Sequence, residues 1–285
     1  MLMRSRIMES MNQLTAEKRK AVVAQLVEGM SVNATARLTG VSKPTILKLT
    51  RDLGLACAVF HDQHVRGLKP ATVQTDEIWA FIGAKAKNVR PEREAEGWGD
   101  VWTWTAITDQ KLIAAYRVGL RTQEDANEFM LDLAGRVNNR TQLTSDGHTT
   151  YLGAVSNAFG FDVDYAQLVK TYGGTGAERS SEAKYSPPKI NGSKKVPVIG
   201  LPDRELISTS HVERHNLTIR MSMRRFTRLT NAHSKKWENH ERSIQLFAVW
   251  YNYCRVHSTL KTSPAVASGL ADHVWTLDEL IGLLD

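Results

Sequence analysis

The sequence predicts an α/β protein, with a mixed sheet and flanking helices preceded by a small all-α domain. Helical spacing of apolar residues dominates residues 1–55, strand-like apolar runs begin near Thr72, and helix and strand patterns then alternate. Alternation of this kind is typical of a sheet covered by helices. The chain has 285 residues, of which 42% are hydrophobic, and this is enough to build a substantial core.

The first 55 residues follow the pattern helix, helix, glycine turn, helix. Ser31 is placed to cap the second helix, Gly40 suits the tight turn, and Ser42 is placed to cap the third helix. This arrangement resembles the helix-turn-helix of DNA-binding proteins, in which the last helix presents its first residues to the base edges. A small three-helix bundle whose basic residues only solvate its surface fits the same pattern. The DNA-binding set expected on the third helix is Ser42, Lys43, Thr45, Lys48 and Arg51.

The rest of the chain predicts a sheet and then a helical end. The run VQTDEIWAFIG, which starts at Val73, has apolar side chains on both faces, as a central strand does. VWTWTAITD and KLIAAYRVGL predict a hairpin beside it, and a helix, a strand that ends at Asp146 and a further strand follow. The expected domains are the helix-turn-helix domain 1–55, a linker 56–71, the sheet domain 72–230 and a C-terminal helical region 231–285.

Two carboxylates of the sheet domain are in unusual places. Asp76 lies in the middle of an apolar strand, where an unpaired charge is costly. Asp146 lies where a strand ends and a glycine-containing turn begins, a common position for functional residues in α/β sheets. Each also has a structural explanation, since Asp76 can pair with a buried arginine and Asp146 can form an Asx-turn or a cap.

A third carboxylate, Glu213, lies in a basic helix. Between Leu206 and Trp237 there are seven Lys or Arg, three His and this single acid. Apolar residues at helical spacing predict an amphipathic helix over 206–226, with Glu213 at the edge of its buried face and Arg220 two turns later. A surface salt bridge would explain Glu213, but it would not explain Asp76.

Three blocks that contain these acids resemble a known family. QTDEIWAFIGAK, TSDGHTTY and HVERHNLTIRMSMRRFTRLT are similar to the signature blocks of the bacterial insertion sequence 1 family of transposases, and the likeness runs from about Thr72 to the end of the chain. The resemblance implies a ribonuclease H-like catalytic domain with an Asp-Asp-Glu triad. It also implies that Asp76, Asp146 and Glu213 are catalytic, metal-binding residues and that Arg220 is the basic catalytic residue that follows them.

Three carboxylates suit phosphodiester chemistry. Two divalent ions can lower the pKa of a water, stabilise the leaving oxygen and neutralise the phosphate, and hard oxygen ligands hold them. We therefore expect two Mg²⁺ or Mn²⁺ ions in each active site, and a transposase that cleaves transposon ends and transfers strands into target DNA. His215 and Asn216 can contact DNA, orient a metal ligand or pack against the sheet. The DNA contacts expected around Glu213 are Arg214, His215, Asn216, Arg224, Arg225 and Arg228.

Two features depart from the family pattern. Residues 171–205 are rich in Gly, Pro, Ser and Lys and have neither a helical nor a strand period. We expect an inserted, flexible basic segment there, either a lid or a DNA-contacting arm. Cys57 and Cys254 are isolated, so the cysteine zinc ribbon that family members often carry cannot form.

The net charge of the chain limits the class of its partner. A formal charge of +7 favours a polyanion, either nucleic acid or an anionic membrane surface, and composition alone does not choose between them. With the resemblance to transposases, we expect double-stranded DNA, both the terminal inverted repeats of the element and its target. Because two element ends must meet, we expect at least a homodimer. No apolar run reaches the roughly 18 residues that span a bilayer, so we expect no membrane contact and a cytoplasmic, nucleoid-associated bacterial protein.

Two other functions fit the same sequence. The first is a helix-turn-helix regulator, or a domesticated transposase, that binds DNA without cutting it. The second is another ribonuclease H-like nuclease, such as a resolvase, that cuts DNA without joining it. An intact triad argues against the first, and joining of a 3′ end into target DNA would exclude the second.

Overall fold

The computed structural model describes residues 14–173, 189–227 and 230–285. The chain forms two compact units. The first, which we call the sheet unit, comprises Val65–Trp79 and Val101–Leu217. The second, the helical unit, comprises Met1–His64, Ala80–Asp100 and Thr218–Asp285. Each unit is assembled from separate stretches of the chain, whereas the sequence predicted consecutive domains.

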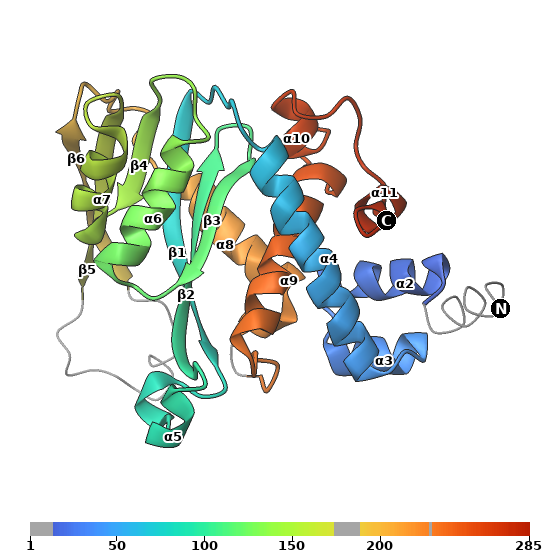
Figure 1. The fold of residues 1–285 in the computed structure, drawn as a ribbon. Coiled ribbons are helices and arrows are strands. Elements are labelled where there is room, and N and C mark those ends of the chain that lie inside the picture. The colour runs from blue at the N-terminus through green and yellow to red at the C-terminus, as the bar shows by residue number, and fades with distance from the viewer. Residues whose placement is uncertain (1–13, 174–188, 228–229) are drawn as a thin grey trace. The chain divides into compact units, whose positions relative to one another are not determined.

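Six strands form one sheet in the order β3-β2-β1-β4-β5-β6 (Figure 1). β1 pairs in parallel with β4 and β4 pairs in parallel with β5, whereas the pairs β2–β3 and β5–β6 are antiparallel. This confirms the predicted mixed sheet with flanking helices. The strands are β1 (Thr72–Ile82), β2 (Gly99–Thr108), β3 (Ile113–Gly119), β4 (Gln142–Asp146), β5 (Asp164–Gly173) and β6 (Lys189–Ile199).

Helices α6 (Gln123–Ala134) and α7 (Thr150–Phe159) cover one face of the sheet (Figure 1). Trp104 of β2 is fully buried there, with its ring centroid 5.9 Å from that of Phe129 and 5.5 Å from that of Tyr151. Its indole Nε1 donates to a backbone carbonyl at 3.1 Å, so the polar end of the ring has a partner. Burial of each such side chain contributes roughly 1.5–3 kcal/mol, and the cluster therefore holds both helices on the sheet.

The first half of helix α8 (Ser210–Ser222) lies on the opposite face. Gln74 of β1 accepts hydrogen bonds from the backbone N of His211 at 2.7 Å and of Val212 at 3.2 Å, so a side chain of the sheet caps the first turn of the helix. This explains why α8 begins four residues later than the predicted start at Leu206. The predicted helix also ends early, because a separate 3₁₀ turn, η2 (Arg224–Phe226), follows it.

Helices α2 (Ala16–Val27), α3 (Val32–Thr39) and α4 (Lys43–His64) begin the helical unit. Ser31 Oγ accepts from the backbone N of the third residue after it at 3.1 Å and so caps α3. Gly40 ends α3 in the left-handed region, with φ at 68°, where a side chain would be strained. The predicted order of helix, helix, glycine turn, helix is therefore confirmed.

Helix α4 is longer than predicted, because it continues to His64 through part of the expected linker, 56–71. That part of the linker prediction is wrong. The extension packs against helix α9 (Trp237–Val249), and a Cβ added at Gly54 would lie 2.2 Å from Arg242 O. The missing side chain lets the two helix backbones approach closely, and no pattern within α4 alone reveals this contact.

Helices also occupy much of 231–285, where a C-terminal helical region is expected. Helix α9 continues directly into a π-helix, η3, which ends before Arg255. The shorter helices of the helical unit are η1 (Ala86–Asn88), α5 (Pro91–Glu94), η3 (Trp250–Cys254), α10 (Pro264–Ala267) and α11 (Leu277–Gly282).

Strand β6 falls within 171–205, for which the sequence predicted no regular structure. That prediction is wrong for 189–199, which pair antiparallel with β5 from Tyr165↔Ile199 to Gly173↔Lys189. Backbone hydrogen bonds hold an edge strand, so it needs little of the apolar alternation that marks a strand in a sequence. Residues 174–188 lie outside the described residues.

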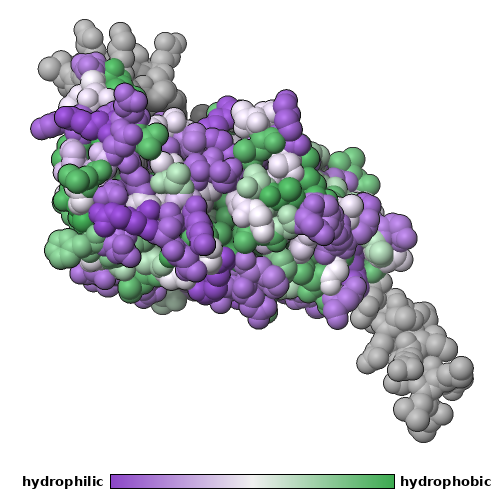
Figure 2. Space-filling view, turned by 90° about the horizontal axis from the view of Figure 1, so that it is seen from above, coloured by the Kyte–Doolittle hydropathy of each residue, from purple (hydrophilic) through white to green (hydrophobic). Residues whose placement is uncertain are grey.

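The face of the molecule drawn in Figure 2 is largely hydrophilic, with hydrophobic residues in small groups. Single exposed apolar residues such as Phe161 and Leu201 are ordinary on a protein surface. In the part of the chain that the structure describes, no helix has both the length and the apolarity that a bilayer span requires.

Candidate metal centre

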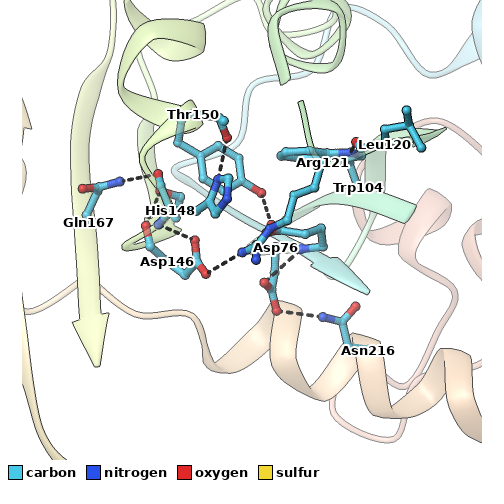
Figure 3. Close-up of polar contacts among 12 residues, drawn as sticks. Asp76, Trp104, Leu120, Arg121, Asp146, His148, Thr150, Gln167 and Asn216 are labelled. Atoms are coloured by element: carbon cyan, nitrogen blue, oxygen red, sulfur yellow. Dashed lines mark hydrogen bonds and ion pairs between the residues drawn. The ribbon is translucent and has the colours of Figure 1, made fainter. Parts of the chain in front are cut away.

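Asp76 and Glu77 are neighbours on strand β1, and the backbone N of Glu77 donates to Asp76 Oδ1 at 2.9 Å. Asp76 faces helix α8, where Asn216 Nδ2 donates to Asp76 Oδ2 at 2.8 Å (Figure 3). Glu77 faces helix α7, where Tyr151 Oη donates to Glu77 Oε2 at 2.9 Å. Arg121, which follows strand β3, donates from Nε to Glu77 Oε1 at 2.6 Å. Different segments of the chain therefore anchor the two carboxylates.

Asp146 is the last residue of strand β4, which lies next to β1. The two strands are parallel, and their register, continued two residues beyond the last pair, brings Asp146 level with Asp76. Asp146 Oδ1 accepts from His148 N at 2.9 Å, which is the Asx-type turn expected as a structural explanation of this residue. The turn leaves Oδ2 on the side of Arg121, 4.0 Å from Nη2 (Figure 3). The turn and a place in the cluster are thus compatible.

Three carboxylates converge at this point. Asp76, Glu77 and Asp146 each offer one oxygen, and these oxygens lie within 4.8 Å of one another. Hard oxygen ligands of this kind suit Mg²⁺ and Mn²⁺. The structure thus brings together Asp76 and Asp146, the first two members of the expected triad. We call these three residues the carboxylate cluster, and it can hold a divalent cation.

The carboxylate cluster is short of positive charge. Burial, followed by the charges of Glu77 and Asp146, raises the pKa of Asp76 to about 7. Burial and the charge of Asp146 also raise the pKa of Glu77, although Arg121 and Tyr151 oppose the rise. A bound divalent cation would favour the ionised carboxylates and so lower both pKa values. The donor atoms and their charge therefore fit a divalent cation.

Glu213 lies beside the carboxylate cluster but is not part of it. Its Oε1 accepts hydrogen bonds from Lys170 Nζ on strand β5 and from Thr209 Oγ1, the latter at 2.5 Å. The charge of Glu213 is still close enough to add to the rise in the pKa of Asp76. The expected triad is thus only partly assembled, because Asp76 and Asp146 meet while Glu213 is bound to Lys170.

Glu77 is the site residue that the sequence prediction missed. A signal was present, since Glu77 follows Asp76 directly and precedes the apolar run that begins at Ile78, and its side chain is only 2% exposed. A buried carboxylate needs compensation, as Asp76 does. The partners of Glu77 are 44 residues away at Arg121 and 74 residues away at Tyr151, which no local pattern shows.

The three residues after Glu213 have different environments. His215 is 2% exposed, so it packs inside the protein, in agreement with the packing alternative. Its expected contact with DNA stays a prediction. Asn216 donates to Asp76 and so orients a carboxylate of the carboxylate cluster, and its expected contact with DNA stays a prediction. Arg214 is exposed, and its expected contact with DNA stays a prediction.

Arg220, the expected basic catalytic residue, belongs to the helical unit. Its Nη1 donates to the backbone carbonyl of Phe226 at 3.2 Å, so it joins helix α8 to the turn η2. Arg224 is exposed in that turn, and Arg228 lies outside the described residues. A catalytic role for Arg220 stays a prediction.

A cationic cavity of about 310 Å³ lies within the helical unit. Lys43, Arg224, Arg225 and Lys235 are among the residues that line it, and the described lining contains no carboxylate. Arg225 Nη1 donates to Ser234 Oγ at 2.8 Å and to a backbone carbonyl at 2.7 Å, and burial lowers the pKa of Arg225 to about 10. Lys43, Arg224 and Arg225 were expected to bind DNA from two distant parts of the sequence, and the cavity brings them together.

The other expected DNA contacts of helix α4 have partners within the protein. Ser42 Oγ lies 2.8 Å from Thr45 Oγ1, and Lys48 Nζ donates to an aspartate one turn later at 2.6 Å. Arg51 Nε lies 4.0 Å from a glutamate of α9. Exposed pairs of this kind contribute about 0–1 kcal/mol, so a phosphate can replace the carboxylate at low cost. Binding of DNA by these residues stays a prediction.

The sequence matches no protein-family profile and no curated protein. Among solved structures, it aligns with a piggyBac transposase in a synaptic complex with hairpin DNA. That alignment covers 94% of this chain and 69% of the other, at 11% sequence identity and a TM-score of 0.40. A structural similarity this weak is not evidence for a shared function. The resemblance to insertion sequence 1 transposases therefore stays a hypothesis based on three sequence blocks.

Proposed function

We propose that this chain is a DNA transposase, a metal-dependent enzyme that cleaves DNA at transposon ends and transfers the released strands into target DNA. The convergence of Asp76, Glu77 and Asp146 at the end of a parallel strand carries the proposal. Clustered carboxylates with raised pKa values favour a site that binds divalent cations, and such sites catalyse phosphodiester exchange. The three sequence blocks support the same reaction.

The residues of the chain orient the ligands. Asn216 holds Asp76 through its side-chain amide, and the backbone N–H of His148 holds Asp146. A pair of Mg²⁺ or Mn²⁺ ions, when bound, supplies a water of lowered pKa and neutralises charge on the phosphate. The proposed metal ligands are Asp76, Asp146 and Glu213, with Glu77 as a fourth carboxylate.

The proposed reaction needs no nucleophile from the protein. Water attacks the phosphodiester during cleavage, and the released 3′ hydroxyl attacks the target during strand transfer. The number of phosphodiester bonds is unchanged in the second step, because one bond forms as another breaks. We therefore assign no covalent role to a serine or tyrosine.

The helical unit is proposed to bind the DNA. The glycine turn before helix α4 supports this, as does the cationic cavity. Lys43, Arg224 and Arg225 would neutralise phosphates, which adds affinity and salt dependence without reading base sequence. The DNA would be the terminal inverted repeats and then the target, and at least two chains would act together because two ends must meet.

A nicking assay in Mn²⁺ tests the proposal, with a plasmid that carries the sequences flanking the gene. Wild-type protein is expected to nick at the element boundary and to join the 3′ end to target DNA. Asp76→Asn, Asp146→Asn and Glu213→Gln are each expected to slow cleavage more than about a hundredfold, because each removes a metal ligand. Asp162→Asn changes an exposed carboxylate of the same unit and is the matched control.

Other outcomes point to the alternative functions. Binding of the ends without nicking by wild-type protein would indicate a regulator or a domesticated transposase. Nicking without joining would indicate a nuclease such as a resolvase. If one of the three carboxylate variants cleaves at the wild-type rate, that residue is not a metal ligand.

A further inference from the structure

We propose that Lys170 is an internal counter-ion that holds Glu213 away from the carboxylate cluster and competes with a divalent cation for it. The inference rests on the proposed metal centre and concerns how that centre is completed. In this scheme the protein without metal has a ligand set of Asp76, Glu77 and Asp146, and Glu213 joins when the cation displaces the ammonium group of Lys170.

The contacts of Glu213 support this. Both Lys170 Nζ and Thr209 Oγ1 donate to the same oxygen, Oε1. The lysine side chain is 20% exposed while the glutamate is 45% exposed, so most of the lysine side chain lies against the protein and its ammonium is paired with this carboxylate. Within the described residues, Glu213 is the group that accepts a hydrogen bond from Lys170. The pair is therefore a specific contact rather than an incidental surface one.

The sheet explains why Lys170 reaches this position. Strand β5 pairs with β4 as far as Leu168, which lies opposite Asp146. Lys170 is two residues further along, so it lies on the same face of β5 as Leu168, just beyond the end of β4. At this level β5 pairs only with β6, where Lys170 lies opposite Ser193. The lysine is thus on the strand next to Asp146, at the edge of the carboxylate cluster.

Arg121, the basic residue on the other side of the cluster, differs from Lys170. Arg121 is committed to Glu77 through Nε at 2.6 Å and Nη2 at 2.5 Å. Its guanidinium is planar and delocalised, and two bonds fix it. Lys170 has a flexible stem and a single point charge, so it can leave Glu213 without disrupting a network. Lys170 is therefore the cation that a metal ion would displace.

Binding of Mn²⁺ to the full-length protein, followed by electron paramagnetic resonance of the free ion, tests the inference without reference to activity. Lys170→Met is expected to tighten Mn²⁺ binding about fivefold, because it removes the competitor while keeping the length of the side chain. Lys170→Arg is expected to stay near the wild-type affinity. Lys194→Met removes an exposed charge from the neighbouring strand and should leave the affinity unchanged.

A double variant separates competition for Glu213 from a general effect of charge. If Lys170 acts through Glu213, adding Lys170→Met to Glu213→Gln should not tighten Mn²⁺ binding any further. Tightening of the same size in both backgrounds would overturn the inference, as would an unchanged or weaker affinity of Lys170→Met alone. Circular dichroism of each variant establishes that it is folded.

A second measurement uses the wild-type protein alone. Mg²⁺ should increase the rate at which acetic anhydride acetylates Lys170, measured by mass spectrometry, while the rate at Lys194 stays constant. Equal rates at Lys170 with and without Mg²⁺ would contradict the displacement.

Failure of the proposed function gives a different result from failure of the counter-ion proposal. If the metal centre itself is wrong, wild-type protein will not bind Mn²⁺, or Asp76→Asn will bind it equally well, and both proposals are then overturned. Normal Mn²⁺ binding with no effect at Lys170 would overturn the counter-ion alone.

Discussion

Asn216 Nδ2 donates a hydrogen bond to Asp76 Oδ2 across 2.8 Å, and this bond joins helix α8 to strand β1 over 140 residues of sequence. Glu213 lies one helical turn before Asn216, so the same helix carries a carboxylate and a residue that orients another carboxylate. The position of α8 thus determines how the Asp76 carboxylate is oriented and how close Glu213 lies to the carboxylate cluster.

Loss of the Asn216 amide should weaken catalysis more than DNA binding. In Asn216→Ala, Asp76 loses a donor that holds it toward the cluster, and we expect cleavage to slow about 10- to 100-fold. Single-turnover nicking and gel-shift affinity, measured on the same preparation, check this. Asn157→Ala, an exposed change on helix α7, is the control. An equal loss in both assays would contradict the prediction, since it would indicate a structural defect.

Removal of Arg121 should destabilise the protein by leaving Glu77 buried without a cation. Glu77 is 2% exposed and Arg121 is 38% exposed, so we expect Arg121→Met to cost about 2 kcal/mol, less than a fully buried pair would. Urea unfolding at pH 8 measures the loss. Adding Glu77→Gln should recover part of the stability, because the uncompensated charge is then absent. If the double variant is less stable than Arg121→Met, the pair is not the cause.

The free energy of unfolding should fall as the pH rises from about 4 to about 7 because of Asp76. The pKa of Asp76 is about 7 in the folded protein and about 3.9 in the unfolded chain. Between these values the folded state keeps a proton that the unfolded state has lost. The resulting stabilisation is fully present below about pH 4 and is lost through pH 7, with a slope of at most about 1.4 kcal/mol per pH unit.

Asp76→Asn tests this pH dependence. Urea unfolding of wild-type protein and of the variant between pH 4.5 and 8 should give curves that diverge in favour of the variant as the pH rises. Mg²⁺ should restore stability to the wild-type protein at pH 8, because it stabilises the ionised carboxylate, and it should have a smaller effect on the variant. Parallel curves would show that Asp76 has the same pKa in the folded and the unfolded protein, which would contradict the prediction.

Two glycines in helices should respond to alanine with opposite signs. A Cβ at Gly54 would lie 2.2 Å from the backbone oxygen of Arg242, so Gly54→Ala should separate α4 from α9 and cost about 2 kcal/mol. A Cβ at Gly153 would lie 3.3 Å from the end of the flexible Gln123 side chain, so Gly153→Ala should stabilise α7 by about 0.5–1 kcal/mol. Thermal unfolding measures both. Stabilisation by Gly54→Ala would contradict the close approach of α4 and α9, and destabilisation by Gly153→Ala would contradict the room expected beside α7.

Removal of a cation from the cavity of the helical unit should lower the salt dependence of DNA binding. Lys43→Ala or Arg224→Ala each removes one phosphate contact, so the slope of log Kd against log salt concentration should decrease by about 0.9. Gel shifts on DNA that carries the element ends, at four salt concentrations, give the slope. Lys69→Ala, an exposed lysine of the sheet unit, should leave the slope unchanged. An unchanged slope in all three variants would exclude the cavity as a phosphate site.

Features that depend on residues close together in the chain could be predicted from the sequence. Ser31 and Gly40 set the two ends of α3 through contacts within one turn, and both ends could be predicted from the sequence. The apolar faces of β1 marked a central strand, and parallel pairing with β4 then places Asp76 level with Asp146. Such features depend on the preferences of residues that are close in the chain, and these preferences produce recognisable patterns in the sequence.

Features that depend on contacts between distant segments could be seen only in the folded chain. Folding recruited Glu77 to the cluster and bound Glu213 to Lys170, 43 residues away. Packing against α9, close to Gly54, also extended α4. Pairing with β5 made residues 189–199 an edge strand, although they lack a strand pattern. Burial, ion pairing and backbone pairing between distant segments stabilise the protein only after the chain has packed. A local sequence pattern therefore does not show which distant residue will be the partner.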